Sequence, residues 1–198
     1  ILYSKNGEWN LMCALMIRKA KKSDVRKVAE LVYTTEDDPS LLWGGNSKEE
    51  CLDNLCSLIR SRGSRYSLDY ISVAEYNGVV EGMIILIPYE RFQKLSSNTD
   101  KIVLKKTKGF IKKLKFFIDQ VRYYSVEECE KGELYIANIA TSDSVRGIGI
   151  GKRLMYHAEM EAKKYNKNVC SLIAKDEFVE KFYKKIDYDT VMDRLILG

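Results

Sequence analysis

Three glycines and two basic residues form the stretch of this chain whose spacing most clearly indicates chemistry. It reads Arg146, Gly147, Ile148, Gly149, Ile150, Gly151 and Lys152, in that order. Glycines let backbone N–H groups converge where a side chain would collide. The first turn of a following helix adds N–H groups without partners and the positive end of the helix dipole. With the charges of Arg146 and Lys152 beside them, these groups are predicted to bind a phosphate or pyrophosphate.

Two common phosphate-binding motifs do not fit this stretch. A P-loop needs a glycine five residues before Gly151, where this chain has Arg146, and a serine or threonine where it has Arg153. A dinucleotide fingerprint needs a third glycine where this chain has Lys152. What remains is Arg-x-x-Gly-x-Gly, and a glycine-rich turn without a ligand is the alternative interpretation.

Composition narrows the class of protein. The chain has 198 residues, 45% of them hydrophobic and 31% charged, as expected of one globular domain. No apolar run approaches the roughly 20 residues of a membrane-spanning helix, so no membrane association is expected. Five cysteines without paired metal-ligand spacing predict reduced thiols, a cytoplasmic protein and no metal site. The single histidine, His157, lies within a helical pattern and is interpreted as a helix residue, not a catalyst.

The positive charge of the chain is local. The net charge is +5, but residues 101–122 hold many lysines and only one acidic residue, Asp119. A basic segment of this kind is weak evidence for a nucleic-acid partner, which is therefore not expected.

The glycine stretch must be positioned by a strand before it and a helix after it. Apolar residues from Glu133 to Thr141 predict the strand, and the pattern from Lys152 to Lys164 predicts the helix. A buried strand, Val169–Ala174, would complete a parallel unit. A helix at Glu177–Lys185 and final strands at Tyr188–Met192 and Leu195–Leu197 are expected after it.

The first half of the chain predicts a strand, two helices and a hairpin. Ser23 or Asp24 can begin the first helix, and Ser47 with Glu50 forms a capping box for the second. Asn77-Gly78 predicts a type I′ turn. The expected strands are Leu15–Ala20, Ile71–Tyr76 and Val79–Ile87, and an amphipathic helix is expected at Phe110–Val121. Residues 1–15 are taken as a leader or extension of unclear status, and 16–198 as one domain with an insert at about 89–132.

Three features together resemble the GNAT superfamily of N-acetyltransferases. The spacing of Arg146, Gly149 and Gly151 is similar to its acetyl-CoA signature, and the order of elements is similar to its fold. The run from Phe182 to Tyr188 resembles its closing F-Y-x-x-x-G-F segment, with Asp187-Tyr188 in place of Gly-Phe. The resemblance implies an α/β (α+β) fold: a mixed, twisted sheet of about six to seven strands, flanked by helices on both faces, whose fourth and fifth strands splay apart around acetyl-CoA.

The resemblance also implies which residues hold acetyl-CoA. The pyrophosphate is expected on the stretch from Arg146 to Lys152. The pantetheine arm is expected to pair with the backbone of the fourth strand at Ile139, Ala140 and Thr141. Asp176 stands roughly where the family often has an asparagine before its last helix and is included in the cofactor site.

Two residues are predicted to catalyse the transfer. Glu133 lies at the spacing from Arg146 where one branch of the superfamily keeps its catalytic glutamate, and it is the predicted base; a solvated strand-end glutamate is the alternative. Tyr183 is placed by the resemblance near the sulfur, where it can protonate the thiolate; a core tyrosine is the alternative. Asn138, a polar residue in an apolar strand, is predicted to bind the substrate or a water, or to satisfy a neighbouring strand end.

The acceptor site is expected at the loop between the first two helices, which often walls it in this fold. Three carboxylates, Glu36, Asp37 and Asp38, and the aromatic Trp43 can hold a cationic amine, or can belong to a capped, solvated loop. Of these, Asp37 and Trp43, with Asn138, form the predicted substrate site. The predicted function is transfer of an acetyl group from acetyl-CoA to a primary amine, of a small molecule or a protein, by direct attack in a ternary complex. The alternative is an acyl-CoA-binding module without turnover; a monomer or homodimer is expected.

Overall fold

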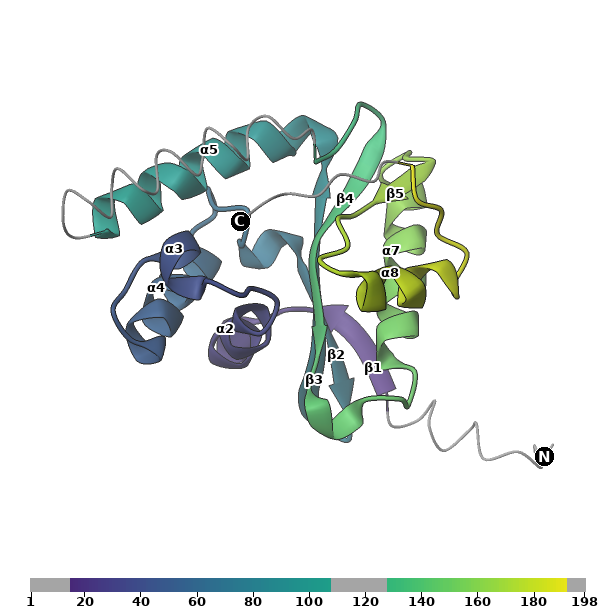
Figure 1. The fold of residues 1–198 in the computed structure, drawn as a ribbon, viewed down its shortest axis with the longest axis horizontal. Coiled ribbons are helices and arrows are strands. Elements are labelled where there is room, and N and C mark those ends of the chain that lie inside the picture. Colours follow the sequence, from purple (N-terminus) through teal and green to yellow (C-terminus); the bar gives the residue numbers. More distant parts are fainter. Residues whose placement is uncertain (1–14, 108–127, 192–198) are drawn as a thin grey trace.

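Five strands make one mixed sheet in the computed structural model, which describes residues 15–107 and 128–191 (Figure 1). The order is β1-β2-β3-β4-β5; the first four strands are antiparallel and β5 runs parallel to β4. The strands are β1 (Leu15–Lys19), β2 (Ile71–Tyr76), β3 (Val79–Pro88), β4 (Glu133–Thr141) and β5 (Val169–Ser171).

Helices cover both faces of this sheet, as predicted (Figure 1). On one face lie α2 (Val25–Tyr33), α3 (Pro39–Trp43), α4 (Lys48–Arg60) and α5 (Tyr89–Lys106). On the other lie α7 (Ile150–Lys164) and α8 (Glu177–Lys184). Short 3₁₀ turns, η1 (Lys22–Asp24), η2 (Leu68–Tyr70) and η3 (Asp143–Val145), join these elements.

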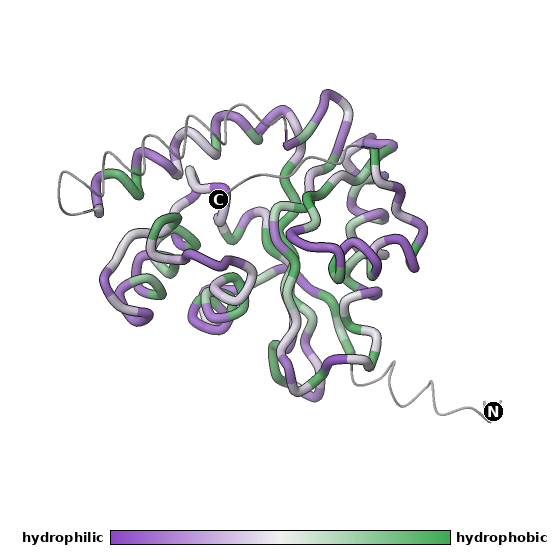
Figure 2. The backbone as a smooth tube through the Cα atoms, in the orientation of Figure 1, coloured by the Kyte–Doolittle hydropathy of each residue, from purple (hydrophilic) through white to green (hydrophobic). Residues whose placement is uncertain are grey.

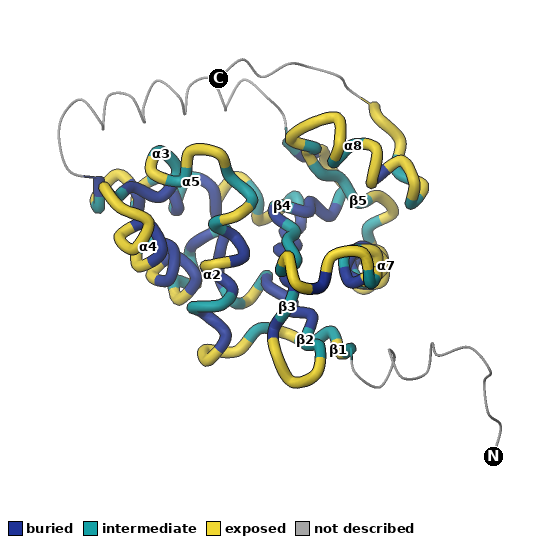
Figure 3. The backbone as a smooth tube through the Cα atoms, turned by 60° about the horizontal axis from the view of Figure 1, so that its bottom comes forward, coloured by how far each residue is buried: buried dark blue, intermediate teal, exposed yellow. Residues whose placement is uncertain are grey.

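The sheet separates two hydrophobic cores because successive side chains of a strand point to opposite faces. In β3, Met83, Ile85 and Ile87 pack against α2 and α4, whereas Ile84 and Leu86 pack against α7. Figure 2 shows that hydrophobic residues are frequent in the central strands, and Figure 3 shows that these strands are largely buried. Burying an isoleucine side chain contributes about 1.5–3 kcal/mol, so β3 holds both layers in place.

One local prediction is confirmed by the backbone, and a second is confirmed in part. Asn77 and Gly78 have φ values of 51° and 79°, the left-handed pair that a type I′ hairpin turn requires. The Ser47 side chain caps α4 by accepting the backbone N–H of Glu50 at 3.2 Å. The Glu50 carboxylate does not close the predicted box on Ser47 but accepts the backbone N–H of Asn46 at 2.7 Å.

The predicted number of strands was too high. The described residues form five strands, not six to seven, and β5 ends at Ser171 instead of Ala174. Residues 188–191 form no strand, because the chain turns back on α8: Asp187 has φ 65° and the Tyr188 N–H donates to the Tyr183 carbonyl at 3.1 Å. Met192 and the predicted strand Leu195–Leu197 lie outside the described residues.

The predicted insert at about 89–132 begins with α5, whose Leu95 and Val103 are buried in the core on the α2 side. The helix predicted at Phe110–Val121 lies outside the described residues, as do residues 1–14. The domain limits therefore stay a prediction. No helix in the described ranges is long and apolar enough to cross a membrane.

One edge of β4 is left open by the short β5. Only Glu133, Leu134 and Tyr135 of β4 pair with β5, at Val169, Cys170 and Ser171. From Ile136 to Thr141, β4 pairs with β3 alone among the strands described. The fourth and fifth strands thus part where the resemblance to the superfamily implies a splay.

Candidate active site

The glycine turn lies at the end of β4 and leads into α7. Gly147 and Gly149 have φ values of 84° and 90°, a left-handed conformation that favours glycine. Gly149 precedes the first residue of α7, and no described side chain caps that end of the helix; its first turn also lacks acidic residues. The N–H groups and the positive dipole end are therefore available to an anion, as the sequence predicts.

Space is open above the turn. A Cβ built on Gly147 or Gly149 would meet no described atom within 4 Å. Arg146 pairs with Asp143 at 2.7 Å, but both side chains are largely exposed, so this ion pair contributes little stability. The Arg146 guanidinium can consequently leave Asp143 for a bound phosphate at small cost.

The open edge of β4 presents main-chain groups to whatever lies beside it. The Ser142 N–H donates to the Glu81 carbonyl of β3 at 2.8 Å. Because main-chain groups alternate along a strand, those of Ala140 also face β3, and those of Ile139 and Thr141 face the open edge. Of the three residues predicted to pair with the pantetheine arm, Ile139 and Thr141 have the required direction.

A β-bulge interrupts β4 at Ala137. Ile85 pairs with Asn138 and Leu86 with Ile136, so Ala137 is the extra residue. Bulges often occur beside active sites, where they redirect a side chain. Here the buried Asn138 amide donates to the Thr35 hydroxyl at 2.9 Å and to the Glu36 carboxylate at 3.5 Å. Asn138 therefore joins the open edge of β4 to the loop after α2.

The three carboxylates of that loop have different roles. Asp38 caps α3, accepting the Leu41 N–H at 3.2 Å and the Ser40 hydroxyl at 2.8 Å. Asp37 is exposed and pairs with Lys175. Glu36 is the one that reaches β4, and burial raises the pKa of its carboxyl, partly opposed by the charge of Arg65 and the bond from Asn138. The sequence points to this loop but not to Glu36 within it.

A partly buried ion pair lies on the same face of the sheet, and the sequence gives no signal for it. The Arg65 guanidinium contacts the Glu128 carboxylate at 3.2 Å and lies over the Phe92 ring at 5.3 Å. The Tyr135 hydroxyl donates to the same carboxylate at 2.7 Å, and burial raises the pKa of Tyr135 well above its usual value. The charge of Arg65 also acts on Glu36, whose pKa it lowers.

The two predicted catalytic residues lie in different surroundings. Glu133 begins β4, and its carboxylate accepts the Glu130 N–H at 2.8 Å, closing the turn before the strand. Tyr183 is buried on α8 between Phe182 and Tyr188, with ring centroids 5.4 and 6.1 Å away. Burial raises the pKa of Tyr183 to about 12, so the phenol is neutral at pH 7.

Two other predicted site residues are held by local structure. The Asp176 carboxylate caps α8 by accepting the Val179 N–H at 2.8 Å. Trp43 is 1% exposed, and its ring packs against Tyr33 and Tyr66 with centroids 6.0 and 6.1 Å away. Trp43 belongs to the hydrophobic core on the α2 side of the sheet and presents no surface to a substrate.

An exposed ion pair crosses from one layer of the molecule to the other. Lys175, between β5 and α8, contacts Asp37, between α2 and α3, at 3.1 Å. Since these loops belong to opposite faces of the sheet, the pair passes around the open edge of β4. Asp37 is thereby placed at the rim of that edge.

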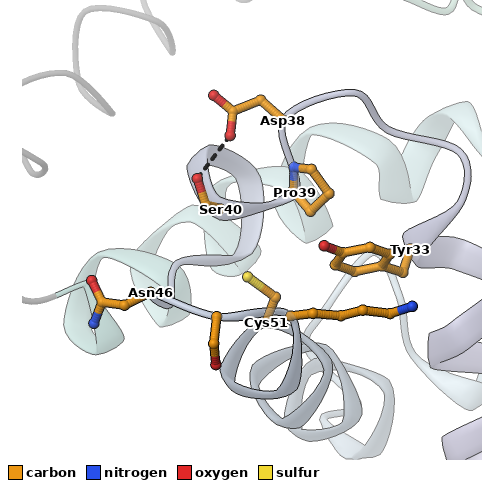
Figure 4. Close-up of a pocket in the computed structure, with 8 residues that line it drawn as sticks. Tyr33, Asp38, Pro39, Ser40, Asn46 and Cys51 are labelled. Carbon is orange, nitrogen blue, oxygen red and sulfur yellow. Dashed lines mark hydrogen bonds between the residues drawn. The ribbon is translucent and has the colours of Figure 1, made fainter.

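A small hollow lies between the end of α2, α3 and the start of α4 (Figure 4). Its volume of about 260 Å³ is below the usual range for ligand pockets. Lys48 lies over the Tyr33 ring at 5.4 Å, and the Cys51 thiol donates to the Gly44 carbonyl at 3.0 Å. Its lining residues belong to α2, α3, α4 and the loops between them and not to β4, so we do not assign this hollow to the site.

The described residues contain no cluster of side chains suited to a metal ion. Of the cysteines within the described ranges, Cys56, Cys129 and Cys170 are free thiols. Among the described residues, the candidate site offers main-chain N–H groups, carboxylates, an amide and a phenol.

The fold and the open-edged site define an acyltransferase-like α/β protein, and comparison with known proteins agrees. The model of the acetyltransferase (GNAT) domain matches residues 67–190. The chain belongs to this family of acetyltransferases. A comparison with curated proteins found no significant match.

Solved structures with this fold include several acetyltransferases. A structure described as an acetyltransferase is 25% identical with a TM-score of 0.68, covering 89% of this chain and 90% of its own. An N-acetyltransferase from Staphylococcus aureus Mu50 is 26% identical with a TM-score of 0.60, covering 87% and 89%. The aminoglycoside N-acetyltransferase AAC(6')-Iy, solved with CoA, is 14% identical with a TM-score of 0.53 over 93% of each chain, which supports the fold alone.

Proposed function

We propose that this protein transfers an acetyl group from acetyl-CoA to a primary amine by direct attack in a ternary complex. One observation carries the proposal: an uncapped helix start after two left-handed glycines follows directly on a strand with an open edge. The first feature suits a pyrophosphate, and the second suits an extended arm with amide groups.

The residues present fit acetyl-CoA, which supplies an acetyl thioester when bound. The N–H groups of Ile150, Gly151 and Lys152 and the side chain of Arg146 would hold the pyrophosphate. Ile139 and Thr141 would pair with the pantetheine amides. Asp176 would act on this site through the start of α8, since its carboxylate is already bonded to Val179.

Acetyl transfer requires the acceptor ammonium to lose a proton before its nitrogen attacks the thioester carbonyl. The C–N bond forms, the C–S bond breaks, and the thiolate takes a proton while the nitrogen loses its second one. Tyr183 would protonate the thiolate, since its phenol is neutral at pH 7. For the base, the spacing of the sequence predicts Glu133.

The acceptor would approach from the α2 side of β4. Asn138 would orient it, and Asp37 at the rim would attract its positive charge. Trp43 would support this side from within the core. Small-molecule and protein amines both suit these residues, and the enzyme would act as a monomer or homodimer.

An acyl-CoA-binding module without turnover is favoured by one observation: the predicted base, Glu133, is bonded into a turn. Thiol release from acetyl-CoA separates the two functions. We expect release that depends on added amine, measured with n-butylamine, lysine, spermidine and a short peptide with a free N-terminus. Saturable acetyl-CoA binding without amine-dependent release would support the binding module instead.

A further inference from the structure

We propose that Glu36 is the general base that deprotonates the acceptor amine. This inference rests on the proposed acetyl transfer and gives the base a different residue from the one that the sequence predicts. Glu36 lies in the loop after α2, on the sheet face opposite α7, and contacts β4 through Asn138.

Glu36 contacts β4 at a point that suits a reaction at the open edge of this strand. Asn138, whose amide donates to the Glu36 carboxylate at 3.5 Å, directly precedes Ile139, whose main chain faces that edge. The bulge at Ala137 separates this part of β4 from the part that pairs with β5. A carboxylate at this point lies beside the strand where the thioester arm is proposed to run.

Glu133 lies at the other end of the same strand. Five residues separate it from Asn138, which is about 16 Å along an extended chain. Its carboxylate is also occupied by the Glu130 N–H at 2.8 Å. Glu133 therefore suits the structural role of ending a turn, whereas Glu36 contacts Asn138 in the part of β4 whose other edge is open.

The surroundings of Glu36 make its carboxylate a stronger base than an exposed one, because its pKa is raised. Burial raises its pKa, and the neighbouring charge of Asp37 raises it further. Arg65 lowers it, as do the bonds from Asn138 and Thr35; the buried phenol of Tyr66 also faces it. Because Arg65 is paired with Glu128, it offsets the desolvation of Glu36 without forming an ion pair with it.

The proton balance is simple. Glu36 takes one proton from the ammonium, the free amine attacks, and the second proton of the nitrogen compensates the one that Tyr183 gives to the thiolate. Glu36 then returns its proton to water. The net reaction consumes an ammonium and a thioester and gives an amide, a thiol and one proton, without any oxidant or metal.

Replacing the carboxylate by an amide of the same shape tests this role. We expect Glu36→Gln to lower kcat/KM for the best amine of the panel about 10²–10⁴-fold at pH 7. Activity should recover partly above pH 9, where free amine is abundant. The KM for acetyl-CoA should stay within about twofold, because Glu36 lies away from the glycine turn.

Two comparisons make the result specific. Glu30→Gln removes a carboxylate from α2 that is exposed and paired with Arg26, and it should leave activity unchanged. Glu133→Gln should cost less activity than Glu36→Gln. Near-parental activity of Glu36→Gln, together with collapse of Glu133→Gln, would return the base to Glu133 and overturn this inference.

A stability measurement adds a test that needs no turnover. A carboxyl whose folded pKa lies above its unfolded pKa binds its proton first in the native state, so the parent should gain stability relative to Glu36→Gln as pH falls from 8 to 5. A constant difference in Tm across that range would overturn the inference.

Two outcomes separate this inference from the proposed function. If the parent releases no thiol with any amine, the proposed function fails and the base role fails with it. If the parent is active and the Glu36→Gln variant is fully active too, only this inference fails.

Discussion

Tyr183 combines a buried ring with a hydroxyl that burial keeps protonated. Its ring packs between Phe182 and Tyr188, and its pKa is raised to about 12. No described side chain bonds to the hydroxyl, and we propose that it donates to a ligand on the α7 side of the open edge. Such a phenol suits a proton donor to a thiolate and does not suit a base.

The Tyr183→Phe variant tests that role because it keeps the ring and removes only the hydroxyl. We expect kcat to fall about 10²-fold or more, while acetyl-CoA binding changes little. Tyr165→Phe, at the exposed end of α7, is the matched control and should be as active as the parent. Equal turnover of Tyr183→Phe and parent would assign Tyr183 to the core alone.

At the scale of elements, β4 and α7 together form the proposed donor side of the site. The glycine turn between them places the positive end of the α7 dipole beside the open strand edge. The left-handed φ of 90° at Gly149 makes this connection possible. Any side chain there would also project into the space that a phosphate would occupy, since that space is open.

Gly149→Glu should therefore abolish acetyl-CoA binding. In the parent, acetyl-CoA at about 100 times its Kd should add roughly 2.7 kcal/mol to the free energy of unfolding, seen as a higher Tm. In the variant we expect no ligand-dependent shift, because the glutamate fills and charges the turn.

Gly132→Glu is the matched control for this experiment. Gly132 also has a left-handed φ, 98°, and open space around it, but it lies before β4, at the end away from the glycine turn. The control should lose a similar amount of intrinsic stability and keep the shift with acetyl-CoA. A full shift in Gly149→Glu would exclude the turn from the donor site.

At the scale of the whole molecule, the sheet must hold two layers of helices that differ in their chemistry. α7 follows the turn proposed to hold the donor, and the loop after α2 carries the residues proposed to meet the acceptor. His157 connects α7 to the sheet, with its Nε2 3.0 Å from the Ser72 hydroxyl of β2. Burial lowers the pKa of His157, and the charges of Lys19 and Lys164 lower it further, against Glu161.

The lowered pKa of His157 determines how the stability of the protein should change with pH. The unfolded chain binds a proton at His157 at higher pH than the native protein does, so the parent loses stability as pH falls through the unfolded pKa of about 6.5. We expect the Tm of the parent to decrease relative to His157→Gln between pH 7.5 and 5.5, measured by thermal denaturation at fixed ionic strength. A pH-independent difference between the two proteins would contradict the buried, neutral state of His157.

Local features of this protein followed from the sequence because each depends on a few neighbouring residues. Asn77-Gly78 adopts the left-handed pair that its side chains tolerate, and Ser47 caps α4 through a bond within one turn. The glycine turn and α7 were predicted for the same reason. Apolar runs and alternating residues also predicted the five strands, β1 to β5, in their order along the chain.

Only the tertiary structure decided how the site is assembled. The bond between Asn138 and Glu36 joins residues 102 positions apart. Three carboxylates in one loop look equivalent in sequence, yet one caps a helix, one pairs with Lys175 and one is half-buried in contact with Asn138 of β4. The ends of strands also depend on tertiary structure, because β5 ends at the residue where its pairing with β4 ends. Burial and long-range partners are set by packing between distant segments, which no local pattern contains.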